Sequence, residues 1–248
     1  MTLTIDTVYL GDCLDVMQEI PDGSIDMILC DLPYGTNHCK WDTLIPFEPL
    51  WEQYNRVIKR NGAIVLTGQG LFSHKLVMSN EYTYRYSMVW KKTNPKGFLN
   101  ANKMPLFIHE DIHIFYKHLP TFHPQYTIGK KYTARRPAGR GGDNYGYVGA
   151  SNIIDKTTRN PTTVVEISNS NYKSLHPTQK PLALLEYLIK TYTNESDTVL
   201  DNCMGSGSTC VAAINTNRHY IGIEKEQRYF DIAQERIRQT KKQHMSKS

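Results

Sequence analysis

Short apolar segments alternate along the chain with stretches of helical periodicity, which predicts an α/β protein with a buried, mostly parallel sheet. Residues 25–30 (IDMILC) and 63–67 (AIVLT) are mostly apolar and predict two core strands. Between them, apolar residues from Phe47 to Ile58 recur at helical spacing, and Asn61-Gly62 is expected to stop this helix. A second helix, near Leu71 to Met78, completes one β-α-β-α unit.

The alternation returns in the last third of the chain. Pro181 opens a predicted helix with an apolar face, and residues 198–200 predict a strand that ends at Asp201. Residues 204–208 (MGSGS) form a glycine turn into a helix that runs to about Asn215. These elements predict a second α/β half.

A last strand and helix follow this glycine turn. Residues 220–223 predict a strand that ends at Glu224, and the apolar residues from Tyr229 to Ile237 predict a helix. The basic tail over residues 236–248 is expected to fray.

The middle of the chain differs in composition from both halves. Residues 118–175 are rich in Gly, Asn, Thr and Tyr and show no helical period, so we expect a loop-rich insert. A chain of 248 residues suits one large domain carrying such an insert. We therefore predict one domain built from residues 1–117 and 176–248, with the insert between them.

The charge of the protein is concentrated in this insert. The formal net charge is +5, and the insert carries all of it, with eight Lys and Arg against three acids. Residues 82–109 hold five more basic residues and no acid. Aromatic residues are interleaved with the basic ones in the insert, a combination expected for nucleic acid. A solvated basic loop would have the same composition and remains the alternative.

Several classes of protein are disfavoured by the sequence. No apolar run reaches about 18 residues, which argues against a membrane-spanning helix. The first ten residues lack a secretory pattern, so a cytoplasmic location is expected. The five cysteines contain no Cys-x-x-Cys pair, which disfavours a zinc ribbon or a disulfide framework.

The first candidate site is the segment Asp31-Leu32-Pro33-Tyr34-Gly35, which follows a predicted strand. Ligands of open α/β sheets bind beyond the carboxyl ends of the strands. A carboxylate, a rigid proline and an aromatic ring at that position suit a planar ligand that forms hydrogen bonds. An ordinary turn has the same composition and remains open on this evidence alone.

The second candidate site combines the turn Gly205-x-Gly207 with Glu224 at the end of the next strand. The glycines let the backbone approach a ligand, and Glu224 lies where an adenosine ribose could donate its hydroxyls. Cys210 stands where a dinucleotide-binding pattern has its third glycine. The pattern favours nucleotide binding, and a plain turn at the start of a helix is the alternative.

One segment contains the sequence motif of a zinc site, but we predict no metal site there. Residues 109–113 (HEDIH) match the zinc-protease motif H-E-x-x-H, which works only on a helix. The residues that follow alternate and are β-branched or aromatic, so a strand is expected, with His109 and His113 about 13 Å apart. We expect a structural role for them and no metal.

Together these motifs resemble the DNA amino-methyltransferases that use S-adenosylmethionine, and in particular their beta group. The catalytic loop precedes the glycine loop in that group, as Asp31 precedes Gly205 here. Leu32 stands in place of the family's first proline, and Asn202-Cys203 in place of Pro-Phe. The matching segments span nearly the whole chain: Gly11-Asp12-Cys13, Asp31-Leu32-Pro33-Tyr34, His176-Pro177-Thr178-Gln179-Lys180-Pro181 and Leu200 to Thr209.

The resemblance implies a Rossmann-like, circularly permuted fold in which residues 118–175 recognise the DNA target. It implies that S-adenosylmethionine methylates the N6 amino group of an adenine flipped out of double-stranded DNA; N4-cytosine is the alternative. A homodimer and a cognate restriction endonuclease are further expected partners. Two rival classes are a nicotinamide-dependent oxidoreductase, which leaves the Asp31 loop unexplained, and a non-enzymatic DNA-binding protein, which leaves both loops unused.

The resemblance also implies roles for individual residues. The implied catalytic residues are Asp31, Leu32, Pro33 and Tyr34. The implied cofactor-binding residues are Asp12, Cys13, Thr178, Lys180, Asp201, Gly205, Ser206, Gly207 and Glu224. From the charge of the insert, the expected DNA-binding residues are Lys130, Lys131, Arg135, Arg136 and Arg140.

Overall fold

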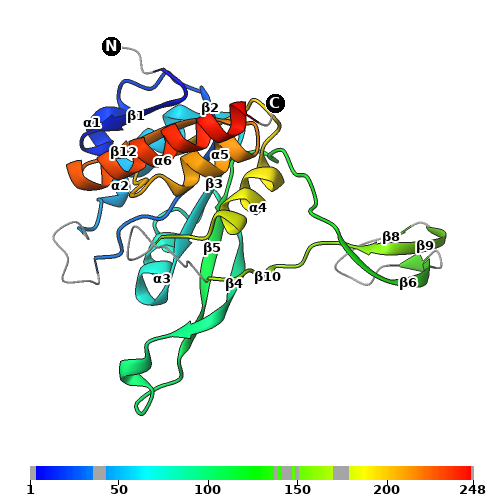
Figure 1. Ribbon diagram of the computed structural model, residues 1–248. Helices are drawn as coiled ribbons and strands as arrows, with labels where there is room; N and C mark the ends of the chain where they lie inside the picture. Colours follow the sequence, from blue (N-terminus) through cyan, green and yellow to red (C-terminus); the bar gives the residue numbers. More distant parts are fainter. Residues whose placement is uncertain are drawn as a thin grey trace. The chain divides into compact units, whose positions relative to one another are not determined.

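The chain forms two compact units in the computed structural model, in which residues 4–35, 43–136, 139–140, 147–148, 151–169 and 179–246 are described (Figure 1). The larger unit comprises residues 1–123 and 163–248, and the smaller one comprises residues 124–162. The smaller unit lies within the segment predicted as an insert. No helix among the described residues is long and apolar enough to cross a membrane.

The larger unit is built on an eight-stranded mixed sheet. Of its seven neighbouring strand pairs, the two that involve β5 are antiparallel and the other five are parallel. In spatial order the strands are β1 (Thr7–Leu10), β12 (His219–Glu224), β11 (Thr198–Asp201), β2 (Ile25–Cys30), β3 (Ile58–Gly68), β5 (Phe107–Phe115), β4 (Tyr84–Lys96) and β10 (Val164–Glu166).

Helices cover both faces of this sheet, as the α/β pattern predicts. One apolar layer packs α4 (Leu182–Tyr192), α5 (Ser208–Asn215) and α6 (Gln227–Met245) against the face that carries Met27 and Leu29. The other packs α1 (Cys13–Met17), α2 (Phe47–Val57) and α3 (Gly70–Met78) against the face that carries Ile28 and Cys30. Successive residues of β2 therefore serve opposite layers, because side chains alternate along a strand.

Two predicted boundaries are wrong. The helix α2 ends at Val57, and Asn61-Gly62 lies inside β3, because pairing with β2 already begins at Ile58. The tail does not fray at residue 236, since α6 continues to Met245. Ile237 is buried in the core, and the Lys241 ammonium donates to the Asp6 carbonyl at 3.1 Å, so contacts with the sheet hold the helix.

Strands occupy much of the region predicted as loop. In the smaller unit, β6 (Thr127–Arg136) and β9 (Ser151–Arg159) form an antiparallel ribbon, and β7 (Gly139–Arg140) pairs with β8 (Tyr147–Val148). The Arg159 guanidinium lies 4.1 Å from the centre of the Tyr132 ring, so a cross-strand contact stabilises the ribbon. The sequence did not predict this ribbon, because its strands are polar and have no apolar face that would give a period of two.

The glycine turn before α5 generates a prediction about stability. Gly207 has a left-handed φ of 76°, and a Cβ there would lie 2.9 Å from the Cβ of Ala233. We expect Gly207→Ala to lower the free energy of unfolding by about 2–4 kcal/mol, through backbone strain and overpacking together. Urea denaturation measures this loss.

Gly23→Ala is the matched control, because Gly23 has a φ of 59° with no atom within 4 Å of the added Cβ. Strain alone should cost about 1–2 kcal/mol there. Equal losses in the two variants would contradict the close packing of the glycine turn against α6.

Candidate active site

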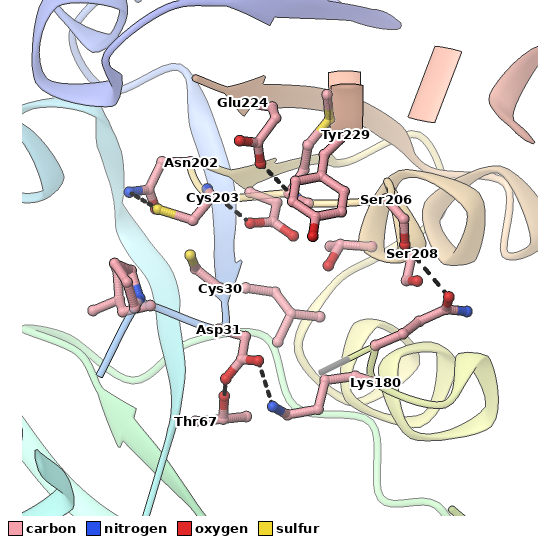
Figure 2. Close-up of a pocket in the computed structure, with 18 of the residues that line it drawn as sticks. Cys30, Asp31, Thr67, Lys180, Asn202, Cys203, Ser206, Ser208, Glu224 and Tyr229 are labelled. Atoms are coloured by element: carbon pink, nitrogen blue, oxygen red, sulfur yellow. Dashed lines mark hydrogen bonds and ion pairs between the residues drawn. The ribbon is translucent and has the colours of Figure 1, made fainter. Parts of the chain in front are cut away.

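Three carboxylates from distant parts of the sequence meet at one edge of the sheet. Asp31 follows β2, Asp201 ends β11 and Glu224 ends β12, and these three strands are parallel neighbours. Their carboxyl ends therefore lie together, beside a cavity of about 450 Å³ that all three residues line. In Figure 2, Glu224 and Tyr229 lie at one end of this pocket, and Asp31, Thr67 and Lys180 lie at the other.

The Asp31 carboxylate accepts hydrogen bonds on both of its oxygens. The Tyr34 hydroxyl donates to Oδ1 at 2.9 Å, and the Thr67 hydroxyl donates to the same oxygen. The Lys180 ammonium donates to Oδ2 (Figure 2). A carboxylate held by three donors is fixed in orientation, and it retains capacity for a further donor because its oxygens offer about four acceptor positions.

The other residues of the Asp31 loop lie against the core. Leu32 is buried, and the Tyr34 ring stacks on Phe72 with centroids 4.6 Å apart. Burial, together with the Asp31 carboxylate beside it, raises the pKa of the Tyr34 hydroxyl well above its ordinary value. Tyr34 therefore remains a hydrogen-bond donor to Asp31 at neutral pH.

The glycine turn is bound to the carboxylate at the end of β12. The Gly205 backbone N–H donates to Oε2 of Glu224 at 2.9 Å, and the Glu226 N–H donates to Oε1 at 2.8 Å. Burial raises the pKa of Glu224 above its ordinary value, although these backbone donors oppose the shift. Ser206 lies in the same turn, and its hydroxyl approaches Gln179 at 3.4 Å. Each Glu224 oxygen can still accept a donor from a ligand.

Further predicted cofactor residues surround the same pocket. The Asp12 side chain accepts from the Leu14 N–H at 2.9 Å and so caps α1, and Cys13 is buried in its first turn. Asp201 is buried and accepts from the Cys203 N–H at 3.1 Å. Burial raises the pKa of Asp201 to about 6. All of these residues line the cavity.

Lys180, one of the predicted cofactor residues, lines the same pocket, and its ammonium bridges two carboxylates. Besides Asp31, it lies 3.1 Å from Oε2 of Glu110. The other Glu110 oxygen accepts from the Lys92 ammonium at 2.5 Å. Burial lowers the pKa of Lys180, but Asp31, Tyr34 and Glu110 reverse this and hold it well above the ordinary value.

Sequence reasoning missed Thr67, Lys92 and Glu110, although a signal for them exists. Along β2, β3, β4 and β5, every second residue faces the helix layer that contains α4. In each strand these residues are apolar, except for the one that reaches the pocket, which is polar. Pairing of Trp90 with Glu110, and of Thr67 with Ile112, places the polar ends of these rows on one face. The rows are Met27-Leu29-Asp31, Ala63-Val65-Thr67, Met88-Trp90-Lys92 and Ile114-Ile112-Glu110.

The predicted strand over residues 109–113 is confirmed, because they lie within β5. His113 is buried, with hydroxyl partners at both ring nitrogens: Ser73 at 2.6 Å and Ser87 at 2.7 Å. No group of three or more potential metal ligands occurs among the described residues.

The predicted DNA-binding residues lie in the smaller unit. Lys130 and Lys131 are exposed on β6. The backbones of Arg135 and Arg136 lie in the same strand, and that of Arg140 in β7, while their side chains lie outside the described part of the chain. Thr178 also lies outside the described residues.

The family model for DNA methylases of the N6 and N4 type matches residues 25–235. The chain is 28% identical to the type II methyltransferase M.HinfI of Haemophilus influenzae, over 96% of this chain and 69% of that protein.

Solved structures show the same fold. The M1.HpyAVI–SAM complex superposes with a TM-score of 0.63 and 26% identity, covering 93% of this chain and 98% of that one. The cytosine-N4-specific PvuII DNA methyltransferase superposes with a TM-score of 0.67 and 16% identity, covering 99% and 94%, and at that identity the likeness shows the fold alone. From the match to the family model, which spans most of the sequence, the chain belongs to the N6/N4 family of DNA methylases.

Proposed function

We propose that the protein transfers a methyl group from S-adenosylmethionine to the N6 amino group of an adenine flipped out of double-stranded DNA. The observation that carries this proposal is the Asp31 carboxylate, held by three donors in the same pocket as the Gly205–Gly207 turn. One wall of the pocket suits a nucleoside cofactor, and the opposite wall suits a base with an amino group.

The residues at the glycine turn fit S-adenosylmethionine. Glu224 has an acceptor position left on each oxygen for the two ribose hydroxyls, as argued above. Gly205 lines the pocket with a left-handed φ of 52°, so the backbone can pass close to a ligand without a Cβ in the way, whereas Gly207 allows the turn to pack against α6. Asp12 at the near edge would accept the adenine amino group, and Asp201 would face the methionine end. When bound, the cofactor supplies an electrophilic methyl group on a sulfonium sulfur.

The Asp31 loop fits a base amino group. Asp31 and the Leu32 carbonyl would accept the two amino hydrogens, which turns the nitrogen lone pair out of the ring system. Pro33 holds the loop rigid, and Tyr34 would lie against the base. With the cofactor bound, the nitrogen lone pair would form the new N–C bond, the electrons of the broken S–C bond would stay on the cofactor's sulfur, and the surplus amino proton would pass to solvent. Positioning and fixed dipoles supply most of the rate.

Adenine is preferred over cytosine because the loop begins with an aspartate, as in the N6-adenine enzymes that it resembles; a serine is commoner in N4-cytosine enzymes. Cytosine is the second candidate, because the family comprises methylases of both the N6 and the N4 type. Both bases present an exocyclic amino group, so the identity of the product decides between them.

Three further features belong to this proposal. The strand that carries the catalytic loop, β2, precedes the strand that carries the glycine loop, β11, although the two pair directly, which supports a circularly permuted order.

A cytoplasmic location, a homodimer and a cognate restriction endonuclease are the expected setting. Protection of host DNA from one restriction enzyme on expression of the protein tests the last point, and unchanged cleavage by every enzyme tried would contradict it.

The first prediction from this proposal concerns the product. Asp31→Ala removes the acceptor for the amino group and should slow methyl transfer by a factor of about 10² to 10³. The assay is transfer of tritiated methyl to DNA from a methylation-deficient host, followed by nucleoside analysis. Asp22→Ala is the matched control, because Asp22 is exposed and pairs only with Arg56 among the interactions described for it.

The parent protein and the control should both yield N6-methyladenine. N4-methylcytosine as the product would overturn the assignment of the base. Parental activity in Asp31→Ala would overturn the mechanism.

The second prediction concerns the smaller unit, which we propose recognises the DNA target. If Lys130 and Lys131 contact phosphates, replacing both by Ala should weaken DNA binding and reduce the slope of log affinity against log salt by up to about 0.9 per contact. Fluorescence anisotropy at several salt concentrations measures the slope. Lys190→Ala, which removes an exposed lysine from α4, is the control, and an unchanged slope in the double variant would contradict the proposal.

A further inference from the structure

Four charged side chains of alternating sign form a chain that begins at the catalytic carboxylate. The Lys180 ammonium bonds Asp31 Oδ2 and lies 3.1 Å from Glu110 Oε2, and Lys92 bonds Glu110 Oε1 at 2.5 Å. The side chains of Lys92, Lys180 and Glu110 are only 7%, 9% and 13% exposed. Ions so far from water are strongly coupled, so a change at one of them is felt by the next.

Lys180 creates a conflict at Asp31. During methyl transfer the target nitrogen gains positive charge while it is hydrogen-bonded to Asp31. An ammonium group on the same carboxylate weakens that interaction by competing for its negative charge and by repelling the nitrogen. A side chain that draws the Lys180 ammonium away from Oδ2 of Asp31 would therefore stabilise the transition state.

Glu110 has the position and the acceptor oxygen that are needed to attract the Lys180 ammonium. Its Oε2 is buried, forms no hydrogen bond and lies at ion-pair distance from the Lys180 ammonium. Lys92 holds the other oxygen, which fixes the carboxylate with Oε2 toward Lys180. Burial raises the pKa of Glu110, but Lys180 and Lys92 outweigh it and hold the pKa below the ordinary value, so Glu110 is ionised.

The charge balance of the four side chains keeps the free-energy cost low when the Lys180 ammonium moves from Asp31 to Glu110. Asp31 and Glu110 are balanced by Lys180 and Lys92, so the set is neutral whichever carboxylate Lys180 bonds. Moving the ammonium between two oxygens that it already contacts needs no ion to enter or leave the pocket, and no buried charge is left without a partner.

We propose that Glu110 is a positioning residue for methyl transfer: it takes up the Lys180 ammonium when the target amino group binds Asp31, and so leaves Oδ2 to that group. This inference rests on the proposed function. Glu110 touches neither substrate nor cofactor in this account, and it acts only through Lys180. A purely structural role, in which Glu110 merely neutralises Lys92, is the alternative that the test must exclude.

The test is single-turnover methyl transfer with S-adenosylmethionine and DNA both saturating. Glu110→Gln keeps the shape but loses the charge, and should slow the step about 10- to 100-fold while both dissociation constants change by less than about threefold. Glu110→Asp, which keeps the charge, should recover a large part of the rate. Glu166→Gln is the matched control, because Glu166 pairs at 2.9 Å with Lys91, the neighbour of Lys92, and is 57% exposed.

A double-mutant cycle tests whether Glu110 acts through Lys180. In a Lys180→Met background, Glu110→Gln should cause little further loss, because the ammonium that it positions is gone. This cycle also compares Glu110→Asp in the two backgrounds, so the test stands even if Glu110→Gln fails to fold. Independent losses that multiply would show a structural role and overturn the inference.

The remaining outcomes separate the inference from the proposed function. Methylation by the parent with an undiminished rate in Glu110→Gln overturns the inference alone. Loss of rate in Glu110→Asp equal to that in Glu110→Gln also overturns it. A parent protein that methylates no DNA overturns the proposed function and this inference with it.

Discussion

Neutralisation of charge at one buried edge of the sheet is the constraint on which the active site depends. The Asp31 carboxylate would attract an amino group through its negative charge, yet it lies beside a core in which an unpaired charge is costly. Lys180, which lies outside the sheet, neutralises Asp31. Glu110 on β5 and Lys92 on β4 complete the balance of charge. Removing any one of the four would leave an unbalanced charge among the other three, so the site stands as a unit.

The fold brings this unit together because β2, β3 and β4 run toward the pocket and the antiparallel β5 begins near it. Apolar rows that face α4 run through the core and finish in a polar residue at the pocket. The antiparallel strand β5 supplies Glu110 from its first half, while Asp31 directly follows β2, and Thr67 and Lys92 lie in the second halves of β3 and β4. The same side-chain alternation that builds the core thus also places the charges.

The sequence predicted the elements that have a local signal. Apolar runs predicted β2 and β3, and strands were predicted to end at Asp31, Asp201 and Glu224, close to where the structure has them. Glu110 was missed, because its role depends on β5 entering the sheet between β3 and β4, a pairing that no local pattern encodes. The ribbon in the smaller unit was missed because its strands are polar, and the length of α6 because contacts with Ser206 and Asp6 hold its end.

In the function that we propose, a methyl donor held at the glycine turn faces an amino group held at Asp31. A crystal structure with S-adenosylmethionine and a target duplex tests it most directly. Our account predicts the cofactor ribose on Glu224, the sulfonium methyl directed toward the Asp31 loop, and an adenine amino nitrogen about 3 Å from the Asp31 carboxylate. A cofactor whose methyl points away from Asp31, or a flipped base bound elsewhere, would contradict it.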